Sequence, residues 1–205
     1  MTQMEQDKDS IAPTAEESIR LLLPSEYADY AAHLLRLDPL SRFMRFAGLV
    51  TEPALRRHAA RVADQRAVVL GYFADGELRG VAELHPLPVR AGRPRSAEIA
   101  FSVERPWQGR GIGSKLMDRL LAYARAHRFE DLQLMFLASN GRMKRMAVER
   151  NARLTNEDDE IIGRLQPRPA TPFSWAREAA RSVSAVAKAA SAMPRRIFLP
   201  HPSKN

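Results

Sequence analysis

The chain has 205 residues, of which 45% are hydrophobic and 27% charged, as in a globular protein rather than a disordered one. It contains no cysteine, which excludes disulfides, thiolate zinc sites and a cysteine nucleophile, and which fits a reducing compartment. The net charge of +8 is spread unevenly: residues 1–17 carry one Lys and five acidic residues, whereas residues 166–205 carry seven Lys or Arg and one acidic residue.

Targeting and metal-binding signals are missing from the sequence. No apolar stretch approaches the roughly 20 residues that span a bilayer, and the acidic N-terminus lacks the apolar core of a secretory signal. We therefore expect a cytoplasmic protein. The five His residues have no metal-ligand spacing, so no metal is expected. Positive charge attracts anionic partners, but aromatic residues do not alternate with the basic ones, so nucleic acid is not the favoured partner.

The first half of the chain predicts a strand, three helices and a hairpin after a disordered acidic arm at residues 1–17. Turn and capping residues set the expected boundaries. The elements are a strand over Ser18–Leu23, a helix from an N-cap at Ser25 to Leu37, helices over Leu40–Ala47 and Glu52–Arg66, and strands over Ala67–Ala74 and Leu78–Leu87 joined by Asp75-Gly76.

The second half alternates strands and helices after a basic loop at residues 88–95. The elements are strands over Ala97–Glu104, Leu132–Leu137 and Glu160–Leu165, with helices over Ser114–His127 and Gly141–Asn151. This order predicts an α/β fold with a mixed sheet, in one compact domain over residues 18–165.

Residues 166–205 read as a basic Ala/Pro-rich tail. Small apolar residues recur at helical spacing from Phe173 to Ala190, beside Arg177, Arg181 and Lys188. This pattern predicts an amphipathic helix of low apolar bulk, which is either solvated or in weak contact with anionic lipid, a partner or the domain itself.

Three glycines, Gly109, Gly111 and Gly113, lie between a predicted strand and a predicted helix. Glycine allows close backbone approach, and a helix N-terminus offers free N–H groups and a positive dipole end, so the segment suits a pyrophosphate. The dinucleotide spacing G-x-G-x-x-G fails because Ser114 or Leu116 occupies its last position, and Ser114 likewise breaks a P-loop. A tight turn without a ligand is the alternative.

The segments Ala97–Val103 and Trp107–Gly113 resemble the acetyl-CoA-binding core of the GNAT superfamily of N-acetyltransferases. The chain is most similar to the GNAT domain of bacterial protein lysine acetyltransferases of the Pat type, and Asp38–Phe46 resembles a helical motif near the start of those domains. Over residues 18–165 the resemblance implies a GNAT-like mixed, mostly antiparallel central sheet, flanked by helices and splayed at an acyl-CoA site.

The resemblance also implies a set of acetyl-CoA contacts. The pantetheine arm would pair with the strand end, and the Val103 N–H would bind the thioester carbonyl as an oxyanion-type donor. Asn140 would contact the cofactor, act as an N-cap, or do both. The implied cofactor-binding residues are Phe101, Ser102, Val103, Gln108, Gly109, Arg110, Gly111, Ile112, Gly113, Ser114 and Asn140.

An acid–base group is needed because the acceptor amine must lose a proton. Glu98 is the candidate, since its apolar strand predicts burial and a raised pKa and its spacing from Gln108 resembles that of the Pat-type catalytic Glu. The alternative is a structural carboxylate paired with an Arg. Glu83 is the second candidate, although a solvent-facing role is favoured. His85 would line an acceptor pocket or simply end a strand.

The sequence departs from the family at two places. Asn140–Asn151 contains no Tyr to act as the general acid, and Asn151-Ala152 replaces the common Gly-Phe. Despite these departures, the resemblance as a whole implies an N-acetyltransferase. It would move acetyl from acetyl-CoA to a primary amine, either a protein lysine or a small molecule, by direct attack in a ternary complex. The alternative function is a non-catalytic acyl-CoA-binding module that regulates or docks a partner.

Overall fold

The computed structural model describes residues 17–65, 67–89 and 91–167. The predicted acidic arm, apart from Glu17, and the predicted helix of the basic tail lie outside the described residues. Within the described part, seven strands form one open sheet in the order β1-β2-β3-β4-β5-β7-β6. They are β1 (Ser18–Leu21), β2 (Val68–Ala74), β3 (Glu77–Pro86), β4 (Ser96–Val103), β5 (Asp131–Leu137), β6 (Arg153–Glu157) and β7 (Glu160–Leu165).

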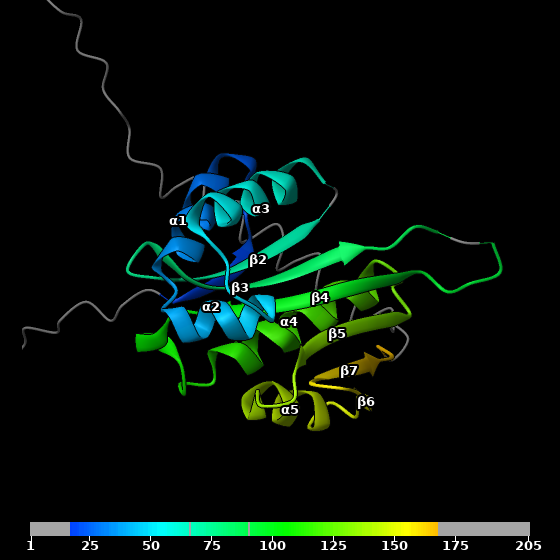
Figure 1. Cartoon of the computed structure of the whole chain (residues 1–205). Helices are drawn as coiled ribbons and strands as arrows, with labels where there is room; N and C mark the ends of the chain where they lie inside the picture. The colour runs from blue at the N-terminus through cyan, green and yellow to red at the C-terminus, as the bar shows by residue number, and fades with distance from the viewer. Residues whose placement is uncertain (1–16, 66, 90, 168–205) are drawn as a thin grey trace, which may run out of the picture.

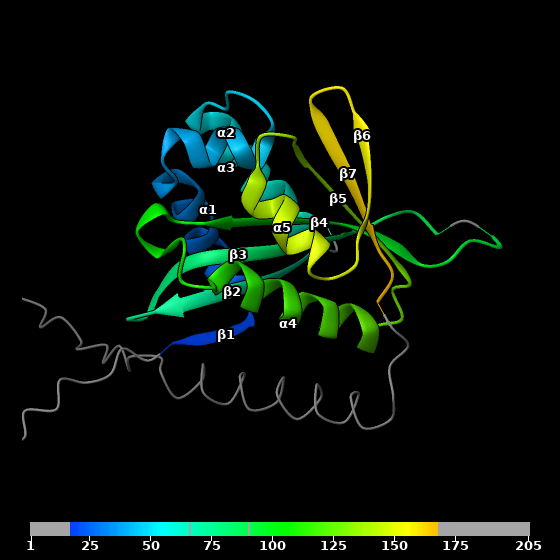
Figure 2. The ribbon, with the colours of Figure 1, turned by 90° about the horizontal axis from the view of Figure 1, so that it is seen from below.

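Helices cover both faces of the sheet (Figure 1). One apolar core joins β2 and β3 to α1 and α3, and the other joins the opposite face to α4 and α5 (Figure 2). The helical elements are η1 (Pro24–Glu26), α1 (Tyr27–Arg36), α2 (Pro39–Phe46), α3 (Glu52–Asp64), η2 (Arg105–Trp107), α4 (Ile112–Ala126) and α5 (Gly141–Val148). The predicted mixed, mostly antiparallel sheet flanked by helices is confirmed.

β4 and β5 form the one parallel pair of the described sheet, and their pairing is short. It covers three residues of each strand and ends at Glu98 opposite Gln133. Beyond that point β5 turns away from β4, as Figure 2 shows. The sheet is therefore split along its middle, and the second half of β4 has a neighbour on one side only.

Local capping explains why α2 begins where it does. Asp38 accepts a hydrogen bond from the Ser41 N–H at 3.2 Å and another from the Ser41 hydroxyl at 2.5 Å, and Pro39 stands at the first helical position. The hairpin prediction is also confirmed, because Asp75 and Gly76 both have positive φ between β2 and β3.

Two predicted helix starts were wrong. Ser25 is no N-cap but lies inside η1, because the Glu26 carboxylate accepts the Leu23 N–H at 2.8 Å and moves the start of the turn back to Leu23. α4 begins at Ile112, two residues before the predicted Ser114, because Gly111 adopts a positive φ of 76° and takes the N-cap position.

The sequence-based prediction missed β6. Its residues are mainly polar and exposed, so they carry no hydrophobic alternation. The strand forms because it pairs antiparallel with β7 through a tight turn at Asp158, which has a φ of 50°.

Candidate functional site

The free edge of β4 exposes backbone groups in the split of the sheet. Glu104 N–H donates to the Arg79 carbonyl at 3.0 Å, on the β3 side. Backbone groups alternate between the two edges of an antiparallel strand, so those of Phe101 and Val103 point away from β3. They face the gap beyond the last β4–β5 pair. An extended ligand can pair with this edge as another strand would.

The glycine loop, Gln108–Gly113, closes the end of that gap and leads into α4. Gly109 and Gly111 both have a φ of 76°, and a Cβ added at either would meet no atom within 4 Å. The backbone conformation therefore requires glycine, and the space beside it is open. Gly113 differs, because its Cβ would lie 3.1 Å from the Met146 sulfur, so it allows α4 and α5 to pack closely.

The other loop residues have separate places. Arg110 is exposed and lies over the Trp107 ring at 4.9 Å, while Ile112 is buried in the core. Ser114 is half-buried, and its carbonyl accepts a hydrogen bond from Arg150 at 3.1 Å. The exposed Arg110 and the first free N–H groups of α4 therefore flank the same open space.

The Gln108 side chain points into the protein. Its Nε2 donates to the Val103 carbonyl at 2.8 Å and to the Ser41 hydroxyl at 2.9 Å, and Arg142 of α5 donates to its Oε1. Gln108 therefore connects α2, β4 and α5 around the split. Only its backbone remains for the predicted ligand contact.

Ser102, predicted as a cofactor residue, belongs to a buried network that sequence reasoning missed. Its hydroxyl lies 2.9 Å from Nε2 of His33, whose Nδ1 lies 3.1 Å from Glu104. Glu104 also accepts hydrogen bonds from Arg36 at 2.9 Å and Arg79 at 3.2 Å. These contacts fasten α1 to the end of β4.

The protonation states of His33 and Glu104 are set by burial and by their hydrogen-bond partners. Burial lowers the pKa of His33 against the opposing hydrogen bond and charge of Glu104. Burial acts to raise the pKa of Glu104, but His33 and Arg36 outweigh it and hold that pKa below its usual value. The network therefore holds a neutral imidazole and an anionic carboxylate. A His at a helical core position, with an Arg three residues later, was its only sequence signal.

Glu98 is exposed, so the predicted burial was wrong. It lies opposite His85 on β3 and opposite Gln133 on β5. Its side chain points to the same face of the sheet as Ser102, the face on which α1, α2 and α3 pack. These helices do not reach the beginning of β4, so Glu98 stays exposed. Glu98 and Val103 are separated by five residues along one strand, or about 16 Å between Cα atoms. The two predicted catalytic residues are therefore not adjacent.

Glu83 is fully buried, so the favoured solvent-facing role was wrong. It lies on the face of β3 covered by α1 and α3, where Arg45 is 2.8 Å, His85 3.0 Å and His58 3.4 Å from its Oε2. We call these four residues the Glu83 cluster. Residues two apart in a strand point to the same face, so Glu83 shares a face with Val81, which is a core residue. This alternation could have predicted that Glu83 is buried.

Asn140 acts as the N-cap of α5, because its side chain accepts the Met143 N–H at 3.2 Å. The predicted capping role is confirmed. Asn151 after α5 has a φ of 58°, a conformation that Asn tolerates, so the chain turns there without the glycine common in the family.

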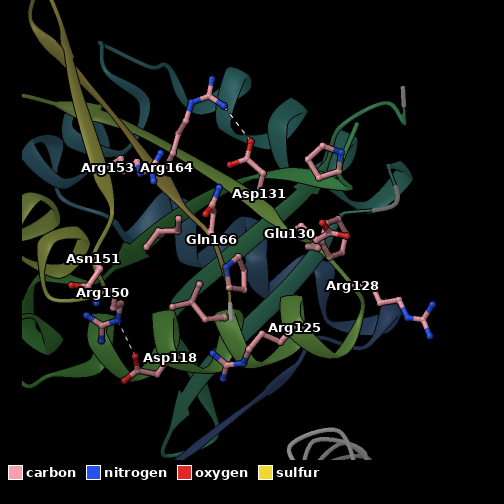
Figure 3. Close-up of a pocket in the computed structure, with 15 residues that line it drawn as sticks. Asp118, Arg125, Arg128, Glu130, Asp131, Arg150, Asn151, Arg153, Arg164 and Gln166 are labelled. Carbon is pink, nitrogen blue, oxygen red and sulfur yellow. Dashed lines mark hydrogen bonds and ion pairs between the residues drawn. The ribbon is translucent and has the colours of Figure 1, made fainter. Parts of the chain in front are cut away.

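A wide cavity lies away from these residues. It has a volume of about 1290 Å³ and sits between the second half of α4, the connection from α5 to β6, and the end of β7. Figure 3 shows that arginines surround it, with Arg150 paired to Asp118 and Arg164 paired to Asp131. It includes none of the residues predicted for the site.

Among residues 17–65, 67–89 and 91–167, no helix is long and apolar enough to cross a membrane. No group of three or more His, Cys, Asp or Glu side chains in residues 17–65, 67–89 and 91–167 has an arrangement suited to a metal ion.

Solved structures share this fold at low identity. The GNAT domain of S. lividans PAT superimposes with a TM-score of 0.65 at 18% identity, covering 77% of this chain and 99% of that one. The putative acetyltransferase yncA from Salmonella typhimurium, solved with acetyl-CoA, gives 0.56 at 17% identity, with coverages of 76% and 96%. The ribosomal L7/L12 alpha-N-protein acetyltransferase RimL, solved with coenzyme A, gives 0.56 at 15% identity, with coverages of 73% and 93%.

Sequence comparison gives the family directly. No curated protein matches the chain significantly. The model of the acetyltransferase (GNAT) family matches residues 33–151, which is more than half of the chain and includes β4, the glycine loop, α4 and β5. The split sheet, the glycine-initiated helix and this match agree, and the chain belongs to the GNAT acetyltransferase family.

Proposed function

We propose that the protein transfers acetyl from acetyl-CoA to a primary amine by direct attack in a ternary complex. The observation that carries the proposal is the split between β4 and β5, with the glycine loop at its end. Family membership and the ligands of yncA and RimL support acetyl-CoA as the donor. The cysteine-free composition supports a cytoplasmic location.

The residues present fit coenzyme A. The open space beside Gly109 and Gly111 would admit a pyrophosphate, and the first N–H groups of α4 would donate to it. The edge groups of Phe101 would pair with the amides of pantetheine. The reactive group that acetyl-CoA brings is a thioester.

Val103 is the proposed donor to the thioester carbonyl. Its N–H points into the split, and its own carbonyl is held by Gln108 at 2.8 Å. A donor fixed before reaction stabilises the charge that develops on the carbonyl oxygen without reorganisation in the transition state. Gln108 is then a positioning residue, because it acts through Val103.

The acceptor is proposed to approach from the open face of β4 and β5. Glu98 is exposed there and its charge would attract an ammonium group. α5 offers no Tyr, so the thiolate would be protonated by water. The Pat-type resemblance of the sequence and the similarity to RimL, a ribosomal L7/L12 alpha-N-protein acetyltransferase, favour a protein amine as the first acceptor to test.

The test is thiol release from acetyl-CoA with a panel of lysine peptides, N-terminal peptides, proteins and small amines, alongside calorimetric titration with acetyl-CoA. Turnover with at least one amine is expected. Tight acetyl-CoA binding without turnover on any acceptor would favour the non-catalytic module. Absence of binding would reject both functions.

A matched pair of glycine variants locates the donor site. Gly111→Ala and Gly92→Ala each place a Cβ at a positive φ, 76° and 70°, where no protein atom lies within 4 Å. The backbone strain is therefore similar. Only Gly111→Ala should weaken acetyl-CoA binding, by about tenfold or more, since 1.4 kcal/mol corresponds to a factor of ten. Equal effects would place the donor elsewhere.

A further inference from the structure

α2 directs three polar side chains inward and two large apolar side chains outward. The inward side chains are Ser41, Arg42 and Arg45, each hydrogen-bonded to another segment of the protein. The outward side chains are Leu40, which is 53% exposed, and Phe43, which is 37% exposed. A surface helix of a globular protein normally has the reverse arrangement. Apolar side chains that share one exposed side of a helix mark a contact with a partner.

Two contacts fix α2 along the second half of β4 (Figure 1). Near its start, the Ser41 hydroxyl accepts a hydrogen bond from Gln108, whose side chain also holds the Val103 carbonyl. Near its end, Arg45 donates to Glu83 on the neighbouring strand β3 at 2.8 Å. α2 also packs on β5. It therefore lies beside the split, and its start is the part nearest to Val103.

The apolar side of α2 faces the split. Each helical residue turns the chain by about 100°, so residues two apart point to nearly opposite sides. Leu40 therefore points away from Arg42, which is directed at α1. Since α1 packs over β3 and α2 over β4, the side away from α1 is the side of β5. Phe43 points away from Ser41, and therefore away from the sheet, at the outer edge of the split.

β5 contributes an exposed apolar side chain across the split. Met135 is 55% exposed, whereas its neighbours Leu134 and Phe136 are buried in the core on the α4 side. Alternation along the strand therefore places Met135 on the face of the sheet where α2 lies. Leu40, Phe43 and Met135 thus come from the two sides of the split, and we call them the apolar rim.

An acidic turn lies at the same end of the split. Residues 157–160 are all acidic and make the turn between β6 and β7, which Figure 2 shows on the same side of the sheet as α2. Glu160 pairs with Leu137, the last residue of β5. Because β4 and β5 are parallel, this is also the end of β4 at which Val103 stands. The acidic side chains there attract a cationic partner and repel an anionic membrane surface.

We propose that the apolar rim binds an apolar side chain of a polypeptide acceptor, within two residues of the amine that is acetylated; this rests on the proposed acetyl transfer. Leu40 adjoins Ser41, which is two hydrogen bonds away from Val103. Phe43 lies about 4.5 Å further along the helix axis. One residue of an extended peptide spans about 3.3 Å, so a side chain one or two residues from the amine reaches the rim. A small amine has no such neighbour.

The test uses the full chain and two fluorescent peptides of equal length and charge, whose single lysine has either leucine or serine as its neighbours. Wild type should acetylate the leucine peptide with a kcat/KM about tenfold higher, since burying most of a leucine side chain supplies at least that factor. Leu40→Ser/Phe43→Ser and Met135→Ser should each reduce this preference. The loss should appear in KM more than in kcat, because the rim contacts the neighbour of the amine and not the reacting atoms.

Val89→Ser is the matched control, because Val89 is an aliphatic residue that is 82% exposed but distant. It follows Pro86, which pairs with Ala97, about 20 Å along β4 from Val103. The control should keep the full preference for the leucine peptide. An unchanged preference in both rim variants, or an equal loss in Val89→Ser, would overturn the proposal.

Fluorescence anisotropy of the same peptides, with coenzyme A present, needs no turnover. Tighter binding of the leucine peptide that the rim variants abolish would support the rim even if acetyl transfer fails. Turnover with no difference between the two peptides would reject the rim and leave the proposed function standing. Sedimentation tests a second copy of the chain as the occupant: a wild-type dimer that Leu40→Ser/Phe43→Ser dissociates, with the peptide preference unchanged, would overturn the proposal.

Discussion

Gln108 donates a hydrogen bond of 2.8 Å from its side-chain amide to the carbonyl oxygen of Val103. The two residues come from the two segments whose resemblance predicts the site, and one fixes the backbone of the other. Gln108, which the resemblance predicts to bind the cofactor, is thus also part of the framework that holds the proposed donor, the Val103 N–H.

Gln108→Leu should reduce kcat more than it reduces acetyl-CoA affinity. The variant leaves the half-buried Val103 carbonyl and the Ser41 hydroxyl without their donor, and each lost bond costs about 1 kcal/mol of stability. Titration calorimetry and steady-state kinetics measure the two effects. Arg142→Gln is the control, because it leaves both Nε2 bonds intact. A loss confined to affinity would show that Gln108 binds the ligand through its side chain.

Gly113→Val should destabilise the protein by about 1–3 kcal/mol through overpacking. The added Cβ would stand 3.1 Å from the Met146 sulfur, and a branched side chain needs still more room. Met146→Ala in the same chain should recover part of the loss, which urea unfolding of both single variants and the double variant would measure. Strict additivity would mean that the two helices do not meet through this pair.

Acid should weaken the fold through His33. Its folded pKa is below the ordinary 6.5, so the unfolded chain binds more protons as pH falls through about 6.5. The contribution of His33 to the free energy of unfolding is therefore complete above that pH and is lost progressively as the pH falls below it. His33→Gln should flatten this slope between pH 7 and 5 in urea titrations. An equal slope in the variant would remove His33 as its source.

Glu83→Ala should cost about 3–5 kcal/mol, because it leaves the Arg45 charge buried without a partner. Glu77→Ala is the matched control: Glu77 also pairs with an arginine, at 2.5 Å, but is 58% exposed, so its loss should cost less than about 1 kcal/mol. Chemical denaturation measures both. Similar losses would show that burial does not distinguish the two pairs.

Local signals predicted most of the fold. The Asp75-Gly76 turn, the break between the helices predicted to end at Leu37 and to begin at Leu40, and the glycine loop each depend on residues close in sequence, and all three lie where expected. Element boundaries moved by one to three residues where a cap was read wrongly, as at Ser25. β6 was missed because an exposed edge strand owes its existence to its partner β7 rather than to its own apolar pattern.

The exposure of the two carboxylates was reversed, for one physical reason. Alternation gives the face on which a strand residue lies, but not how far the covering helices extend. α2 and α3 reach Glu83 through Arg45 and His58 and leave the beginning of β4 uncovered at Glu98. Contacts between residues 38 or 69 positions apart, such as Arg45–Glu83 and His33–Ser102, depend on tertiary packing that no local pattern specifies.

The split in the sheet divides the domain into two lobes whose strands are joined at three residue pairs. The lobe of β5, β6 and β7 is tied to β4 by few strand pairs, so its attachment depends mainly on the apolar core that it shares with α4. A donor that bridges the lobes would stabilise the whole by mass action, and this stabilisation grows with the logarithm of the ratio of donor concentration to dissociation constant. Starvation for acyl donor would then shorten the lifetime of the protein itself, through proteolysis of the opened state.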